Sequence, residues 1–268
     1  MSNDSKPVKD KPKLVDEKNN TSDVPWNPAL GVIFACAVFI IAQFMAAFAV
    51  YGVSFLIKPD NETFLHWFDN SILAKTLLFG FMALFVLLPL RWFTSLYKSN
   101  FGEIGLGRKP KISDLGWSLI AFPIYYLILV VSLVVTKAFV PGLDLEQKQD
   151  LGFNASYQGW QLVGIFFALV VVPPITEEIV FRGFVFGSLK KTMPVIVAAI
   201  LTSLLFGAGH LMEGSGGQPL YIAGIDTFVL SMILIWLRQK TGSLWSSIFL
   251  HALKNGTAFV TLFLLAGR

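Results

Sequence analysis

Charged residues are scarce in this chain. They make up 14% of its 268 residues, whereas hydrophobic residues make up 54%. Soluble globular domains carry about 25% charged residues, so this composition argues against a soluble protein. The formal net charge of +4 is small, and it gives no reason to expect a nucleic-acid partner.

Cysteine and histidine are also rare, and their scarcity narrows the chemistry. Cys36 is the only cysteine, which excludes intrachain disulfides and argues against a cysteine protease. The H-E-x-x-H pair of zincin-type metalloproteases is missing. Only three histidines occur, and two of them, His210 and His251, lie in the apolar C-terminal half.

Long apolar runs are what the sequence has in abundance. About seven of them approach or exceed the roughly 20 residues that a helix needs to cross the hydrocarbon core of a bilayer. Because backbone polar groups must be satisfied within lipid, such runs predict helices. The predicted fold class is all-α, a polytopic transmembrane helical bundle. The runs cover residues 30–57, 72–92, 115–140, 160–190, 194–211, 220–237 and 244–265.

Lysine and arginine are concentrated in the N-terminal tail and in every second connection between these runs. By the positive-inside rule, this distribution places the N-terminus in the cytoplasm. The predicted organisation is a disordered cytoplasmic tail (1–29), N-terminal transmembrane helices (30–140) and a C-terminal transmembrane core (160–265). An integral, multi-pass protein with such short connections is typical of a prokaryotic plasma membrane.

Ionisable residues inside apolar runs are costly and usually mark a functional site. In the fourth run, Pro173 and Pro174 remove two backbone donors and predict a bend or restart of the helix. Glu177 and Glu178 follow directly, and Arg182 lies four residues after Glu178, a spacing suited to a salt bridge. One glutamate can thus be neutralised while Glu177 stays available for chemistry. The alternative is that these residues only mark a cytoplasmic helix end.

Further polar residues occur in the later runs. His210 ends the fifth run, and His251 and Asn255 share one face of the last predicted helix because they are four residues apart. Each could instead be a packing residue or an interhelical hydrogen-bonding contact. Asp226 and Lys254 lie at similar distances from the ends of their helices, so we expect these two side chains to pair.

Three short segments, TEEIVFRG, FGAGHL and HALKN, resemble the motifs of the CPBP intramembrane proteases, also called CAAX-protease and bacteriocin-processing or Abi proteins. The motifs are E-E-x-x-x-R, F-x-x-x-H and H-x-x-x-N. Each alone is weak, whereas all three in this order within apolar segments are specific. The resemblance covers about residues 160–260. It implies that the C-terminal core is the catalytic core of an intramembrane metalloprotease whose site opens towards the cytoplasm.

The resemblance also implies roles for individual residues. Glu177 would be the base that activates water, and Asn255 would position this water or the oxyanion. His210 and His251 would bind a metal or orient the water. The implied metal ligands are Glu177, His210 and His251, and the implied cofactor is a divalent metal, zinc first.

The remaining motif residues have supporting roles in this resemblance. Glu178 and Arg182 would organise the site, and Phe206 would pack within its motif. The sequence leaves open whether the chemistry uses a metal, which lowers the pKa of its bound water, or a glutamate acting as general base.

The predicted function is an endopeptidase that cleaves a membrane-associated peptide or protein. Its substrate could be a prenylated C-terminal tail, a bacteriocin precursor, a membrane anchor or a signalling protein. The alternative is a non-catalytic membrane protein of the same fold that gives immunity to a toxin or scaffolds a partner. A transporter is a third interpretation, although no paired broken segments occur in two matching halves. Beyond the lipid bilayer and the substrate, the sequence names no partner and no oligomeric state.

Overall fold

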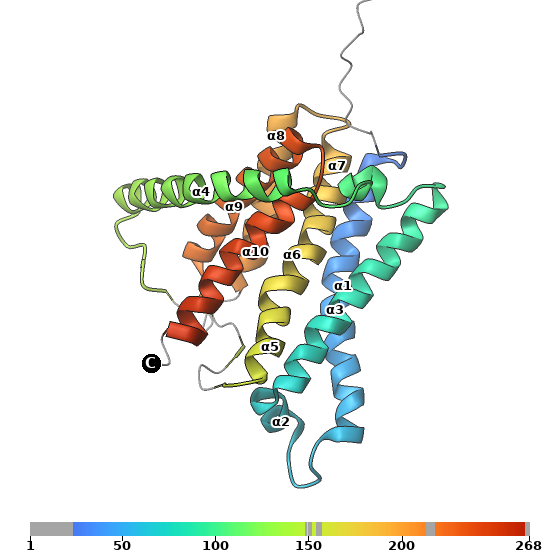
Figure 1. Ribbon diagram of the computed structural model, residues 1–268, viewed down its shortest axis with the longest axis vertical. Coiled ribbons are helices and arrows are strands. Elements are labelled where there is room, and N and C mark those ends of the chain that lie inside the picture. Colours follow the sequence, from blue (N-terminus) through green and yellow to red (C-terminus); the bar gives the residue numbers. More distant parts are fainter. Residues whose placement is uncertain (1–23, 148, 150–151, 154–156, 213–217, 266–268) are drawn as a thin grey trace, which may run out of the picture.

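The computed structural model describes residues 24–147, 149, 152–153, 157–212 and 218–265. Within these residues, seven helical segments are long and apolar enough to cross a membrane, which confirms the predicted all-α bundle (Figure 1). Each segment corresponds to one apolar run of the sequence. They are Pro28–Ile57 (α1), Ile72–Leu96 (α3), Ile112–Phe139 (α4), Gln161–Leu189 (α5 to α7), Val195–Met212 (α8 and a 3-10 turn), Tyr221–Thr241 (α9) and Trp245–Leu265 (α10 and a π turn).

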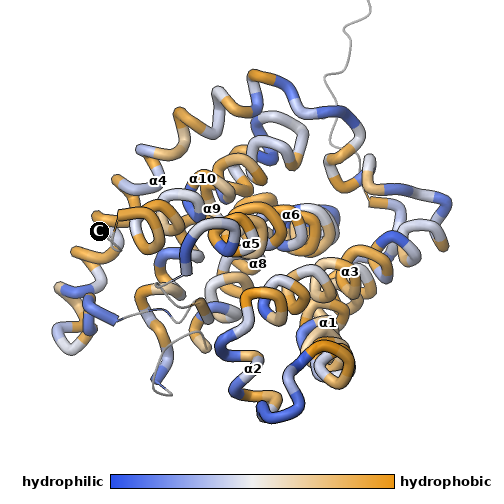
Figure 2. The backbone as a smooth tube through the Cα atoms, turned by 60° about the horizontal axis from the view of Figure 1, so that its bottom comes forward, coloured by the Kyte–Doolittle hydropathy of each residue, from blue (hydrophilic) through white to orange (hydrophobic). Residues whose placement is uncertain are grey.

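The outer helices present apolar side chains to their surroundings. In the most apolar stretches of α1, α3 and α4, only 17%, 22% and 11% of the residues are buried. Figure 2 shows hydrophobic residues along the helices and hydrophilic residues in connections such as that around α2 (Phe64–Asn70). An apolar surface of this extent is compatible with lipid and not with water. The chain is therefore an integral, multi-pass membrane protein, while the side of the membrane that holds its N-terminus stays a prediction.

Helix α4 has a different direction from the other long helices. In Figure 1 it lies across the bundle, whereas α1, α3, α9 and α10 run along it. Ala121 and Tyr125 on α4 are fully buried in a cluster with Leu230 and Leu234 of α9 and Leu250 of α10. This crossing brings the middle of α4 against α9 and α10, the two C-terminal helices that carry candidate site residues.

The first described residues, 24–29, correct one boundary of the predicted tail. Residues 1–23 of the predicted disordered tail lie outside the described residues. Trp26, however, is fully buried, its ring is stacked on Phe184 at a centroid distance of 5.0 Å, and its indole N–H donates to Ser188. Pro28 is already the first residue of α1. The predicted tail over 1–29 is therefore too long, because the burial of a tryptophan anchors its end.

The fourth segment changes its helical register twice. It consists of α5 (Gln161–Phe166), a π-helical stretch η2 (Phe167–Val171), α6 (Val172–Glu177), a second π-helical stretch η3 (Glu178–Val185) and α7 (Phe186–Leu189). Pro173 and Pro174 lie at the start of α6. The predicted disturbance by the two prolines thus takes the form of a register change. Stretches of π-helix are rare and often occur at functional sites.

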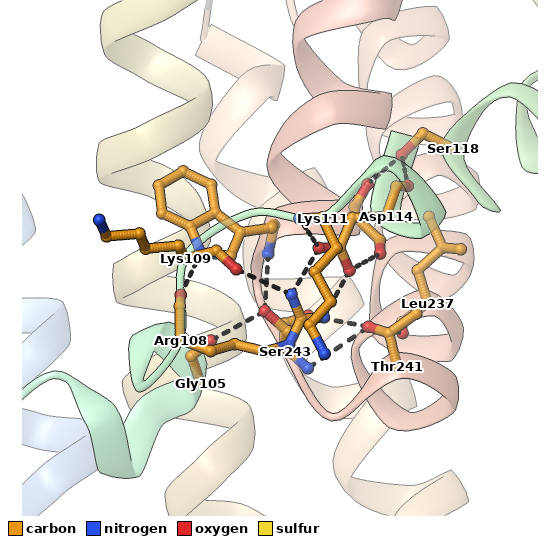
Figure 3. A network of polar contacts seen from close by, with 11 residues as sticks. Gly105, Arg108, Lys109, Lys111, Asp114, Ser118, Leu237, Thr241 and Ser243 are labelled. Carbon is orange, nitrogen blue, oxygen red and sulfur yellow. Dashed lines mark hydrogen bonds and ion pairs between the residues drawn. The ribbon is translucent and has the colours of Figure 1, made fainter. Parts of the chain in front are cut away.

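A polar network fastens one end of the bundle (Figure 3). The Asp114 carboxylate at the start of α4 accepts two hydrogen bonds of 2.6 Å from Arg108 and one of 3.0 Å from Ser246 at the start of α10. Ser243, in the α9–α10 turn, donates to the backbone carbonyl of Gly105. The connection before α4 is therefore tied to the turn that sets the position of α10.

Candidate active site

The two adjacent glutamates lie in different environments. Glu178, at the start of η3, has a fully buried side chain, and Arg182 donates to its Oε1 over 3.0 Å. This is the ion pair expected from their spacing. His251 of α10 reaches the same oxygen with its Nδ1 at 2.9 Å. Because a carboxylate can only accept, this nitrogen carries a proton. A buried carboxylate needs such compensation, and Glu178 has it from two helices.

Glu177 is oriented differently. Its side chain is 12% exposed and lines a cavity of about 250 Å³. Its Oε2 lies 3.8 Å from His251 Nε2, which is too long for a direct hydrogen bond. In the neutral tautomer with its proton on Nδ1, the His251 ring presents a lone pair at Nε2. Two acceptor atoms at this separation can both accept hydrogen bonds from one water molecule.

Asn255 compensates for the double proline. In an α-helix the carbonyl of Leu169 would accept from residue 173, and in a π-helix from residue 174. Pro173 and Pro174 have no N–H to give. The side-chain amide of Asn255 donates to this carbonyl instead, over 2.9 Å. Asn255 thereby fixes α10 to the segment that carries Glu177 and also lines the cavity.

Phe206 is central to the site, although the sequence suggested only packing. Its buried ring lies under the guanidinium carbon of Arg182 at 4.3 Å from the ring centroid, a cation–π contact. The same ring packs edge-on against His251 at 6.0 Å and against His210 at 4.6 Å. The four-residue spacing in F-x-x-x-H was a usable signal, because it puts the ring and the imidazole on one helix face.

His210 directly follows α8 (Val195–Gly209) and is half-buried. Its Nδ1 lies 2.8 Å from the Phe206 carbonyl oxygen, so this nitrogen donates to the backbone of its own helix. The ring lines the same cavity as Glu177 and His251. Of the six predicted catalytic residues, the structure places four on this cavity wall, Glu177, His210, His251 and Asn255. The other two, Glu178 and Arg182, are buried behind it.

The expected pair of Asp226 and Lys254 is present at the same cavity. Lys254 Nζ lies 3.1 Å from Asp226 Oδ2, and both residues line the cavity wall. Sequence reasoning missed Tyr125 of α4, whose hydroxyl donates to the other Asp226 oxygen. No sequence pattern pointed to Tyr125, because only the crosswise course of α4 brings it to α9.

The donor types of the site fit a divalent metal, while their arrangement fits only in part. A carboxylate and two imidazoles are common zinc ligands. The 3.8 Å between Glu177 Oε2 and His251 Nε2 is less than the sum of two metal–ligand distances of about 2 Å, so both atoms can reach one ion. Over the described part of the chain, however, no three His, Cys, Asp or Glu side chains already converge on one point. His210 would have to turn towards the other two donors to complete a site.

Fold and site together define a class. The chain is a helical membrane protein with a small cavity between its helices, lined by a partly exposed carboxylate and two imidazoles from different helices. Residues 159–257, which hold all three motifs, match the family described as type II CAAX prenyl endopeptidase Rce1-like. The family predicted from the motifs, the CPBP intramembrane proteases, is thereby confirmed for this segment.

Individual relatives have low identity to the chain. The membrane-embedded CAAX protease MroQ of Staphylococcus aureus is 27% identical over 164 residues, 58% of this chain and 60% of that protein. The uncharacterized protein YyaK of Bacillus subtilis is 32% identical over 148 residues, 53% of this chain and 47% of YyaK. The putative membrane peptidase YdiL of the same species is 33% identical over 85 residues, 32% of each chain.

The chain thus covers from about a third to three fifths of the length of these curated relatives. No solved structure matches it. The relatives are bacterial, consistent with the predicted prokaryotic membrane, and their names support a membrane protease-like role for this chain.

Proposed function

We propose that this protein is an intramembrane endopeptidase in which Glu177 activates the attacking water. The observation that carries the proposal is the different environment of the two glutamates. Glu178 is fully buried, and its Oε1 is compensated by Arg182 and His251. Glu177 is 12% exposed and lines the cavity, and no described residue bonds its Oε2; the Oε2 of Glu178 is likewise unbonded but has no access to the cavity. A carboxylate without compensation at a cavity wall is suited to accept a proton.

The steps follow from the positions of these groups. Glu177 Oε2 and His251 Nε2 hold one water between them, and Glu177 takes its proton as the hydroxide attacks the scissile carbonyl carbon. When the tetrahedral intermediate collapses, Glu177 returns the proton to the leaving amine nitrogen. The bond to Glu178 keeps the Nδ1 proton of His251 away from the water, so that Nε2 stays an acceptor. Arg182 and Phe206 hold Glu178 and His251 in place.

A divalent metal belongs to this proposal as a second element. Glu177, His251 and His210 are the residues that would hold it, and zinc is the first candidate because of these donor types. When bound, such an ion lowers the pKa of its water towards 7 and polarises the carbonyl. With an ion bound, His251 Nε2 would be a ligand and would no longer accept from the water, and Glu177 would act as base only through the carboxylate oxygen that does not bind the ion.

The cavity limits the form of the substrate. Its volume is about 250 Å³, whereas a 20-residue transmembrane helix with its side chains is a cylinder about 10 Å wide and 30 Å long, roughly 2,400 Å³. An intact transmembrane helix therefore does not fit. We propose that the substrate enters as a few residues of extended chain, such as the end or a loop of a membrane-associated peptide.

The test is cleavage of fluorogenic peptides, both membrane-anchored and prenylated, by detergent-purified protein. Glu177→Gln should lower kcat by at least about 100-fold, because general-base catalysis contributes that much or more. Glu62→Gln, in the α1–α2 connection outside the cavity, is the matched control and should retain full activity. Equal turnover by the wild type and Glu177→Gln would refute the mechanism. A wild type that cleaves none of the peptides would favour the non-catalytic immunity or scaffold role.

A further inference from the structure

The Asp226–Lys254 pair is a charged feature of the cavity that the proposed proton transfers do not use. The ion pair joins α9 to α10 over 3.1 Å, and each side chain is 19% exposed. A pair that served only to join two helices could lie anywhere along their interface. This pair instead lies on the wall shared with Glu177 and His251.

Asp226 and Lys254 differ in how many of their hydrogen-bonding groups are in use. Asp226 has both oxygens engaged, one by the Tyr125 hydroxyl and the other by Lys254. The ammonium group of Lys254 has three donors, and among the described residues it contacts the Asp226 carboxylate. The pair therefore presents N–H donors of Lys254 to the cavity, whereas the acceptor oxygens of Asp226 are occupied by Tyr125 and Lys254.

Lys254 also has the right position for substrate recognition. It lies three residues after His251 and one before Asn255, so all three share the face of α10 that lines the cavity. Among the described lining residues, Lys254 is the only lysine or arginine. A substrate held beside Glu177 and His251 would occupy the cavity that this ammonium group also lines.

We propose that Lys254, held by Asp226 and Tyr125, is a specificity residue that binds a carboxylate of the substrate. The carboxylate is either the C-terminus of the peptide or an acidic side chain near the scissile bond. Both offer the same acceptor to an ammonium donor, and such charge-assisted bonds are the stronger ones. The inference deepens the proposed endopeptidase function and rests on it for the substrate class.

The experiment measures binding separately from turnover. The probe is a dansylated S-farnesyl-Cys-Val-Ile-Ala peptide, made with a free C-terminal carboxylate and with a C-terminal amide. A third peptide keeps the amide end and carries Glu in place of Ile. Fluorescence anisotropy gives the Kd of each for the Glu177→Gln protein in detergent, with and without Lys254→Met. Lys137→Met, at the far end of α4 and outside the cavity, is the matched lysine control.

We expect at least one carboxylate peptide to bind about tenfold or more tightly than the neutral amide. Lys254→Met should remove this preference while the amide peptide keeps its affinity, and Lys137→Met should leave the preference intact. The double variant Asp226→Asn, Lys254→Met removes both charges together and should behave as Lys254→Met does, which covers the case that an unpaired Asp226 disturbs folding.

Equal affinity of all three peptides, or a preference that survives Lys254→Met, would overturn the inference. Failure of the proposed function is a separate result. If the carboxylate preference is found and the wild type still cleaves none of these peptides, the carboxylate site stands and the endopeptidase proposal falls.

Discussion

The side-chain amide of Asn255 on α10 donates a hydrogen bond of 2.9 Å to the backbone carbonyl of Leu169 in η2. This carbonyl lacks a helical donor because both candidate donors, Pro173 and Pro174, have no N–H. The double proline before the glutamates and the asparagine of the last motif therefore act together, because Asn255 supplies the donor that the prolines lack. This hydrogen bond holds the helical segment of Glu177 against α10, which carries His251.

This relationship predicts a rescue. Asn255→Ala should lower the free energy of unfolding by about 1 kcal/mol, the usual size of such a bond within a membrane protein. Adding Pro173→Ala and Pro174→Ala to that variant restores two backbone donors and should return part of the lost stability. Thermal unfolding in mild detergent measures both effects. If the triple variant is less stable than Asn255→Ala alone, the prolines do not create the need for Asn255.

Because Glu178 and Arg182 form a buried ion pair, we expect the losses of unfolding free energy on replacing them to be strongly non-additive. Glu178→Gln leaves the Arg182 guanidinium in an apolar surrounding without its counter-charge, and should cost about 3–5 kcal/mol of stability. Arg182→Met should cost a similar amount by leaving Glu178 with His251 alone. The double variant should cost less than the sum, because no unpaired charge is left. A double-mutant cycle of unfolding free energies measures the coupling, and additive costs would contradict it.

The metal part of the proposal predicts a chelator effect. Phenanthroline should stop cleavage by the wild type, and added zinc should restore it. Metal analysis should find less zinc in purified His210→Ala and His251→Ala than in the Glu62→Gln control, whose carboxylate lies outside the cavity. Full activity in chelator, with no zinc in any sample, would leave water activated by Glu177 alone.

Gly105 predicts a stability effect far from the cavity. Its φ is +108°, a conformation that other residues rarely adopt. A Cβ on Gly105 would also lie 2.6 Å from the guanidinium carbon of the buried Arg238. Gly105→Ala should therefore lower the melting temperature and loosen the tie between η1 (Gly102–Leu106) and the α9–α10 turn.

The matched control is Gly116→Ala in α4. A Cβ on Gly116 meets no atom within 4 Å, and alanine favours a helix over glycine by about 0.5–1 kcal/mol. Gly116→Ala should therefore leave stability unchanged or raise it. Equal behaviour of the two variants would show that the contact of Gly105 with Arg238 carries no constraint.

The sequence by itself determined the class of fold and the composition of the site. Apolar runs near 20 residues predict membrane helices from the cost of an unsatisfied backbone in lipid, and all seven are present as helices. The four-residue spacing of Glu178 and Arg182 predicted an ion pair, and the structure contains it. Such pairs need only the geometry of one helix.

Contacts between helices were harder to predict. The pairing of Asp226 with Lys254 was predicted from their similar distances to the ends of their helices. The sharing of Glu178 between Arg182 and His251 did not, since it depends on how η3 and α10 are rotated about their axes. The double proline predicted a disturbance of the helix, but only the structure shows a π-helical register change and the bond from Asn255.

Tertiary structure alone decided three features. Trp26 shortens the predicted tail because its aromatic contacts form with residues distant in sequence. Tyr125 joins the site because α4 lies across α9 and α10. The glutamate that lines the cavity is Glu177, because the rotation of η3 turns its neighbour Glu178 towards His251 of α10. A periodic pattern gives the face of a helix, whereas packing against neighbouring helices determines what that face meets.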